Sequence, residues 1–183
     1  MIWFVDECGF NIWLRRSYGR SRKGERAYRT AHGQRGKNVS LCLAISSSHI
    51  VHHKIIGAYD RIKFQEFIFE IDALSQERMQ LIMENCRIHY QVDLTNHQLK
   101  FLSPYSPFLN PIEAFFSKLK NHIRGQLRAV DFENMQQTER SYALKQKVVG
   151  AIHHFWNCNN HPLYRHSASF YSICLQKNNI LGD

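Results

Sequence analysis

Three carboxylates stand where buried elements are expected to meet loops. Asp6 and Glu84 each follow a short apolar run, and Glu113 lies in the first turn of a helix that a proline-rich loop precedes. If the two apolar runs are neighbouring parallel strands, both carboxylates emerge at the same edge of the sheet, where sites of α/β proteins tend to form. Three oxygen ligands without a nearby cysteine or histidine cluster suit Mg²⁺ or Mn²⁺ rather than zinc. Two such ions can activate a nucleophilic water and stabilise the leaving oxygen of a phosphodiester.

Each of these acids also has a simpler explanation. Asp6 and Glu84 could merely end strands at the protein surface. Glu113 stands three residues after Asn110, the capping-box spacing at which a glutamate returns to the backbone N–H of the cap residue. Spacing alone therefore leaves both the metal site and these structural roles open.

The strands that would position the acids are short runs of mainly apolar residues, and the second and third are rich in Val, Ile and Leu. Five are predicted, the second and third as a hairpin: Ile2–Val5, Asn38–Ser46, Ile50–Ile56, Leu81–Met83 and Leu99–Leu102. Asp6 is expected to end the first strand and Glu84 the fourth. The order of strands and helices predicts an α/β fold in which helices flank a mixed sheet.

Capping residues and apolar residues at helical spacing predict the helices. They are Arg61–Leu74 after an Asp60 cap, a short helix at Arg87–Leu94, a helix that opens at Asn110-Pro111 and can stop at Gly125, and a last helix from about Thr138 to Trp156. Asn as the cap and Pro at the first helical position are favoured at helix starts.

The composition excludes several classes of protein. A chain of 183 residues fits one domain. The mean hydropathy is −0.42, and no apolar run approaches the length of about 18 residues that spans a bilayer. Asp6 and Glu7 argue against a secretory signal, and five widely spaced cysteines without a Cys-x-x-Cys pair give no disulfide framework or zinc site. We predict a soluble, intracellular protein without a membrane partner.

The charge distribution favours a polyanionic partner. The formal net charge is +9, and nine basic residues against the single acid Glu25 lie between Arg15 and Lys37. Clustered cations gain affinity for nucleic acid by displacing counterions from the phosphate backbone. The residues predicted to contact DNA in this stretch are Arg15, Arg16, Arg20, Arg22, Lys23 and Arg26. A solvated loop that only aids solubility is the alternative.

Three motifs in this order resemble the mariner-type transposases, which are DDE superfamily endonucleases. The segment LSPYSPFLNPIE at 102–113, with the following Lys118-Leu119-Lys120 run, resembles the signature around the third acid of that family. Residues 4–10 and 83–89 resemble the strands of the first and second acids, the latter with its Asn and downstream His. The resemblance implies a ribonuclease-H-like fold with a mixed five-stranded sheet flanked by helices, and two divalent ions that serve in cutting and joining DNA ends.

On this resemblance Asp6, Glu84 and Glu113 are the predicted catalytic and metal-binding residues. It adds Lys118 and Lys120 to the predicted DNA contacts. His89 could touch a phosphate or stabilise local structure, and the resemblance favours the phosphate.

The chain departs from the family pattern at its second acid and in its spacing. Glu84 replaces an aspartate and moves the carboxylate outward by roughly 1.5 Å, whereas a catalytic site tolerates about 0.5 Å. Glu84 and Glu113 are closer in sequence than is usual in the family, and Ser103 replaces a proline. Only five residues precede Asp6, so we expect a single domain over 1–183 without the helix-turn-helix domains that recognise transposon ends.

These departures leave three hypotheses. The first is a transposase-derived DDE endonuclease, intact or degenerate, that uses Mg²⁺ or Mn²⁺ for DNA transposition or integration. The second is a catalytically inactive nucleic-acid-binding protein derived from a transposase. The third, which the proline loop disfavours, is a nuclease of the ribonuclease-H or resolvase type. DNA as the substrate suggests a nuclear location, and a homodimer is a further expected partner.

Overall fold

The computed structural model describes residues 1–12, 20–28, 37–57, 60–74, 77–86, 89, 94, 97–104, 106–127, 135–157 and 159–180. The predicted DNA contacts Arg15 and Arg16 lie outside the described residues. So does the short helix predicted at Arg87–Leu94, apart from His89 and Leu94.

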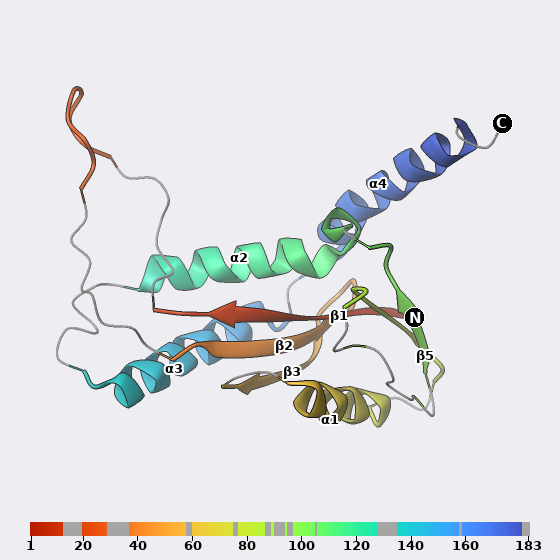
Figure 1. Ribbon diagram of the computed structural model, residues 1–183, viewed down its shortest axis with the longest axis horizontal. Helices are drawn as coiled ribbons and strands as arrows, with labels where there is room; N and C mark the ends of the chain where they lie inside the picture. The colour runs from red at the N-terminus through yellow and green to blue at the C-terminus, as the bar shows by residue number, and fades with distance from the viewer. Residues whose placement is uncertain are drawn as a thin grey trace.

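A mixed sheet of five strands forms the centre of the molecule (Figure 1). The strands are β1 (Ile2–Phe10), β2 (Val39–Ile45), β3 (Ile50–Ile56), β4 (Gln80–Met83) and β5 (Gln98–Phe101). Their order is β3-β2-β1-β4-β5; β1, β2 and β3 pair antiparallel, whereas β4 runs parallel to both β1 and β5. The predicted five-stranded mixed sheet and its hairpin are confirmed.

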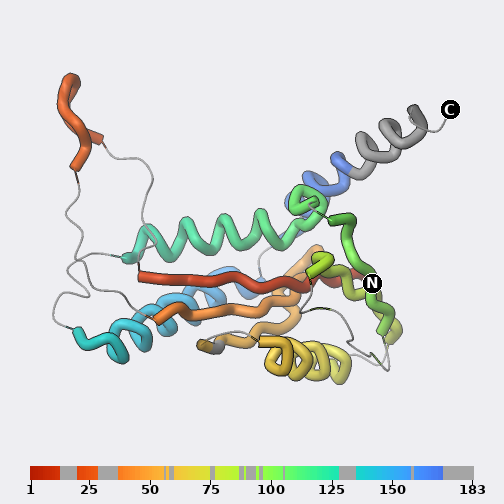
Figure 2. The backbone as a smooth tube through the Cα atoms, viewed as in Figure 1, coloured from red at the N-terminus to blue at the C-terminus, as the bar shows by residue number. Residues whose placement is uncertain are grey.

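Helices cover both faces of this sheet. They are α1 (Arg61–Asp72), α2 (Pro111–Gln126), α3 (Gln137–Phe155) and α4 (His161–Ile180). Helix α1 packs Phe64 and Phe67 on one face, in a core with Trp3 and Val5 of β1. Helices α2 and α3 pack on the other face, where α2 lies along β1 (Figure 2). Because α2 is held against β1 by a buried apolar stripe, a residue in its first turn has a fixed position relative to Asp6.

Strand β1 does not end at Asp6, contrary to the prediction. Its parallel pairing with β4 stops at Val5 and Met83, but its antiparallel pairing with β2 continues from Asp6 to Phe10. Asp6 is therefore buried within a strand, at the point where one neighbouring strand has ended. Glu84 directly follows β4, as predicted.

Two further predictions about the helices were wrong. Helix α2 continues through Gly125 to Gln126, since a glycine inside a helix lowers stability without necessarily ending it. Helix α4 was not predicted, because its buried positions include Ser167 beside the apolar Leu163. The hydroxyl of Tyr164 donates to the carbonyl of Ile45 at 3.0 Å and so connects α4 to β2. Within the described part of the chain, no helix is long and apolar enough to cross a membrane.

Candidate active site

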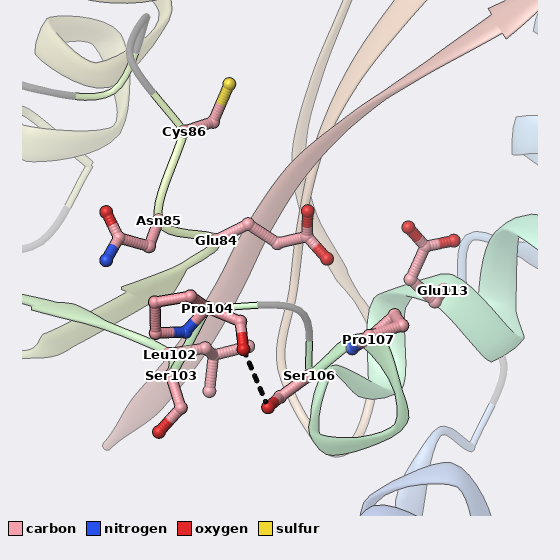
Figure 3. A pocket seen from close by; sticks show the side chains of 9 residues that line it. All are labelled: Glu84, Asn85, Cys86, Leu102, Ser103, Pro104, Ser106, Pro107 and Glu113. Atoms are coloured by element: carbon pink, nitrogen blue, oxygen red, sulfur yellow. Dashed lines mark hydrogen bonds between the residues drawn. The ribbon is translucent and has the colours of Figure 1, made fainter.

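The three predicted acids meet at one place. One carboxylate oxygen from each of Asp6, Glu84 and Glu113 lies within 4.8 Å of the other two. Asp6 is 5% exposed, Glu84 is half-buried and Glu113 is exposed, so the cluster runs from the sheet interior to solvent. Figure 3 shows the side chains of Glu84 and Glu113 pointing toward each other across an open space. The longer side chain of Glu84 therefore reaches the cluster.

The strand register explains this convergence. Val5 and Met83 are the last partners of the parallel pair, so Asp6 and Glu84 are the next residues on adjacent strands. The backbone N–H of Leu102 donates to the carbonyl of Met83 at 2.9 Å, which brings β5 and the following proline loop to the same edge. Glu113 approaches from the other side in the first turn of α2.

Asn110 connects the start of α2 to the first acid. Its Oδ1 accepts from the backbone N–H of Ile112 at 3.3 Å, and its Nδ2 donates to Oδ2 of Asp6 at 3.0 Å. Its own backbone N–H donates to the carbonyl of Pro107 at 3.0 Å, so this group is already used and the capping box proposed for Glu113 does not form. The sequence predicted Asn110 as a cap but gave no signal for its contact with Asp6.

Burial and neighbouring charges raise the pKa of two acids of the cluster, Asp6 and Glu113. Burial raises the pKa of Asp6 to about 8, and the charges of Glu7, Glu84 and Glu113 add to this rise, while a hydrogen bond from the backbone N–H of Glu7 opposes it. Burial and the charge of Glu84 likewise raise the pKa of Glu113. Such a group of like charges is stabilised either by protons or by a bound cation.

A cleft of about 580 Å³ opens beside the cluster (Figure 3). Glu84 and Glu113 line it on one side, and the proline loop with Ser103, Pro104 and Ser106 lines it on the other. Glu84 and Glu113 offer hard oxygen ligands at this cleft, and the buried Asp6 lies within reach of both. Such a donor set suits a divalent metal ion.

The comparison with protein families shows the class of this chain. The family model described as DDE superfamily endonuclease matches residues 1–136. The chain belongs to this family. No curated protein matches the chain in sequence. The resemblance seen in the three sequence motifs is therefore confirmed at the level of the family.

Solved structures of the Mos1 mariner transposase share the fold of this DDE domain. The Mos1 paired end complex with Mg matches with a TM-score of 0.64 and 17% identity, covering 91% of this chain and 53% of that chain. The Mos1 strand transfer complex matches with a TM-score of 0.61 and 16% identity, covering 91% of this chain and 52% of that chain. The isolated Mos1 catalytic domain matches with a TM-score of 0.53 and 12% identity, covering 91% of this chain and 75% of that chain. The DDE domain thus spans about half the length of the longer Mos1 chains, and the predicted ribonuclease-H-like fold is confirmed.

His89 of the DDE domain lies beneath the second acid rather than at the surface. It is 1% exposed and stacks on Phe64 with ring centroids 4.4 Å apart. Its Nδ1–H donates to the carbonyl of Glu84 at 2.7 Å, and its Nε2 lies 3.0 and 3.1 Å from the carboxylate oxygens of Glu7. Both ring nitrogens are used within the protein, which supports the local structural role over the phosphate contact. Neither Glu7 nor this bridge was identified from the sequence.

The predicted DNA contacts fall into two groups. The exposed Arg20, Arg22, Lys23 and Arg26 belong to the segment 20–28, which Figure 1 shows apart from the sheet. This segment turns at Gly24, whose φ of 92° suits a residue without a side chain. Lys118 and Lys120 lie on α2 beyond Glu113, and only Lys120 lines a cleft next to that acid.

Proposed function

We propose that this chain is a metal-dependent DDE endonuclease domain, derived from a transposase, that cuts and joins DNA phosphodiesters in transposition or integration. The observation that carries the proposal is the convergence of three carboxylates within 4.8 Å, at the point where the parallel pairing of β1 and β4 ends. The Mos1 relatives in fold include a strand transfer complex and a paired-end complex with a transposon end. DNA is accordingly the proposed substrate, and the nucleus the proposed location.

The donor set fits Mg²⁺ or Mn²⁺. Asp6, Glu84 and Glu113 would hold the metal, since carboxylate oxygens are the preferred ligands of both ions and the described residues place no cysteine or histidine in the cluster. Mos1 structures have been solved with Mg and with Mn. We propose two ions, which when bound supply Lewis-acid activation of a water and stabilisation of the leaving oxygen.

The protein's own residues hold this site in place and open it to substrate. The hydrogen bond from Asn110 fixes one oxygen of Asp6 and leaves the other beside the backbone N–H of Glu7. Glu84 and Glu113 face each other at the cleft, where a DNA strand can approach both. Fixing the carboxylates in advance lowers the cost of arranging them around the reacting phosphate.

A plasmid-nicking assay tests the proposal directly. The chain is incubated with supercoiled DNA and Mn²⁺ or Mg²⁺, with EDTA as the blank, and Glu113→Gln is compared with Glu66→Gln, an exposed acid on α1. We expect metal-dependent nicking that Glu113→Gln abolishes and Glu66→Gln leaves intact. Metal-dependent nicking that survives Glu113→Gln would refute the proposed site.

The inactive nucleic-acid-binding alternative predicts a different pair of results. Such a protein binds DNA with an affinity that falls steeply with salt, but divalent ions do not raise its melting temperature. A metal-dependent rise in melting temperature that Glu113→Gln removes would exclude this alternative. DNA binding without that rise, and without nicking, would establish it.

A further inference from the structure

A second cleft, of about 260 Å³, opens on the other side of Glu113 along α2. Besides Glu113 and the buried Phe116, its lining is made of Ser117, Lys120, Asn121 and Arg124, which we call the α2 groove. Residues 113, 117, 120 and 124 recur at helical spacing and cover about 16 Å of helix. The groove is therefore a polar track that begins at the third acid and leads away from it.

The charges of the α2 groove favour an anion. Two cations, a hydroxyl and an amide line it, and Glu113 at its end is its only acid among the described residues. The ammonium of Lys120 lies close enough to Glu113 and Cys8 to lower the pKa of both groups against the effect of burial. The basic part of the groove thus lies directly beside the carboxylate cluster.

Arg124 is the residue best suited to hold a phosphate. Its Nη1 donates to Oδ1 of Asn121 at 2.7 Å, which orients the guanidinium on the helix surface. Its Nε is shielded from solvent and has no hydrogen-bond partner among the described residues. No carboxylate in the described part of the chain forms an ion pair with it. The guanidinium carries five N–H donors, so the bond to Asn121 leaves others for a phosphate oxygen.

We infer that the α2 groove binds backbone phosphates of the DNA strand that enters the carboxylate site. The inference rests on the proposed function and deepens it, because it assigns Ser117, Asn121 and Arg124 to DNA binding and separates Lys120 from its neighbour Lys118. Lys118 is exposed and lies outside the groove although it has the same charge.

Fluorescence anisotropy with a labelled DNA fragment tests the groove separately from catalysis, since binding is measured in EDTA over a series of salt concentrations. We expect Arg124→Gln to weaken binding about tenfold at low salt and to reduce the slope of log affinity against log salt by about 0.9, the value for one phosphate contact. Arg124→Lys keeps the charge and should lose less affinity. Lys145→Gln, which removes an exposed charge from α3, is the matched control and should change binding less than twofold.

A second variant keeps the test decisive if Arg124→Gln folds poorly. Asn121 is exposed, so Asn121→Asp adds a negative charge to the groove without removing a buried group. We expect it to weaken binding by a similar factor, whereas Gln65→Glu on α1, on the opposite face of the sheet, should not. Equal effects of the groove variants and their controls would overturn the groove alone. Absence of DNA binding by the wild-type chain would overturn the proposed function together with the groove.

Discussion

Two neighbouring acids on β1, Asp6 and Glu7, have opposite surroundings. Asp6 faces α2 and joins two other carboxylates, and no cationic side chain among the described residues pairs with it. Glu7 faces α1 and contacts the buried His89 at 3.0 Å. Successive residues of a strand point to opposite faces of the sheet, so one peptide bond separates the two environments.

The difference shows which acid serves chemistry and which serves structure. Glu7 has an internal partner in His89, whose Nδ1–H donates to the carbonyl of Glu84. Burial opposes protonation of His89, but the hydrogen bond and charge of Glu7 raise its pKa. The charge of Asp6 is left for a ligand, and burial raises its pKa to about 8. A carboxylate that is buried among other acids and has no internal cation is a metal-ligand candidate on physical grounds alone.

The largest expected effect is the difference between the two acids in catalysis. Asp6→Asn should lower metal-dependent plasmid nicking by at least about 1,000-fold, because a bound metal supplies several kcal/mol of charge stabilisation. Glu7→Gln should lower it by about 10- to 100-fold, as for residues that orient metal ligands. Rates are measured in Mn²⁺ with melting temperatures as a check of folding. Equal losses for the two variants would show that the two acids do not differ in role.

The next effect concerns the stability of the His89 contact. His89→Ala should lower the free energy of unfolding by about 3 kcal/mol, because it leaves the mostly buried Glu7 without its partner. A double-mutant cycle with Glu7→Gln, followed by urea unfolding, measures the coupling. The exposed Lys54–Glu70 pair, at 2.7 Å, is the control and should couple by less than about 1 kcal/mol. Additive losses for His89 and Glu7 would contradict the bridge.

The sequence predicted the three acids of the cluster, but not the hydrogen bonds of Glu7, His89 and Asn110 that surround them. Asp6 and Glu84 follow similar apolar runs, and parallel pairing of those runs was enough to place both acids at one sheet edge. Glu113 was identified as a candidate ligand, with the capping box as the alternative role. That alternative is wrong, because the backbone N–H of Asn110 donates to the carbonyl of Pro107 instead of to Glu113. Local patterns made these acids candidates, and the resemblance of the three motifs to the transposase family selected them as the site.

Long-range side-chain contacts have no such signals. Glu7 and His89 are 82 residues apart, and Asn110 and Asp6 are 104 apart, so their pairing depends on the finished packing of the sheet and helices. Arg124 was overlooked because helical spacing does not show which face of a helix borders a cleft. The continuation of β1 past Asp6 also depends on a tertiary partner, β2.

The pH dependence of stability sharpens the comparison without any catalysis. The folded pKa of Asp6, about 8, lies above the ordinary value of 3.8, so between these values the folded state binds more protons than the unfolded state. Stability in EDTA should therefore fall as pH rises toward 8, by up to about 1.4 kcal/mol per pH unit from this group. The difference between wild type and Asp6→Asn in urea unfolding isolates this contribution. A difference that does not change from pH 5 to about 8 would contradict the raised pKa.

The smallest expected effect separates the two roles of Asn110. Asn110→Ala should cost about 1 kcal/mol through loss of the α2 cap and should also weaken the metal-dependent rise in melting temperature, since Asp6 loses its donor. Asn110→Ser retains a good cap but has too short a side chain to reach Asp6, so it should restore stability and leave the weaker metal response. Calorimetric melting curves with and without Mg²⁺ measure both quantities. If Asn110→Ser restores the metal response as well, the hydrogen bond from Asn110 does not orient Asp6, and the site depends on strand geometry alone.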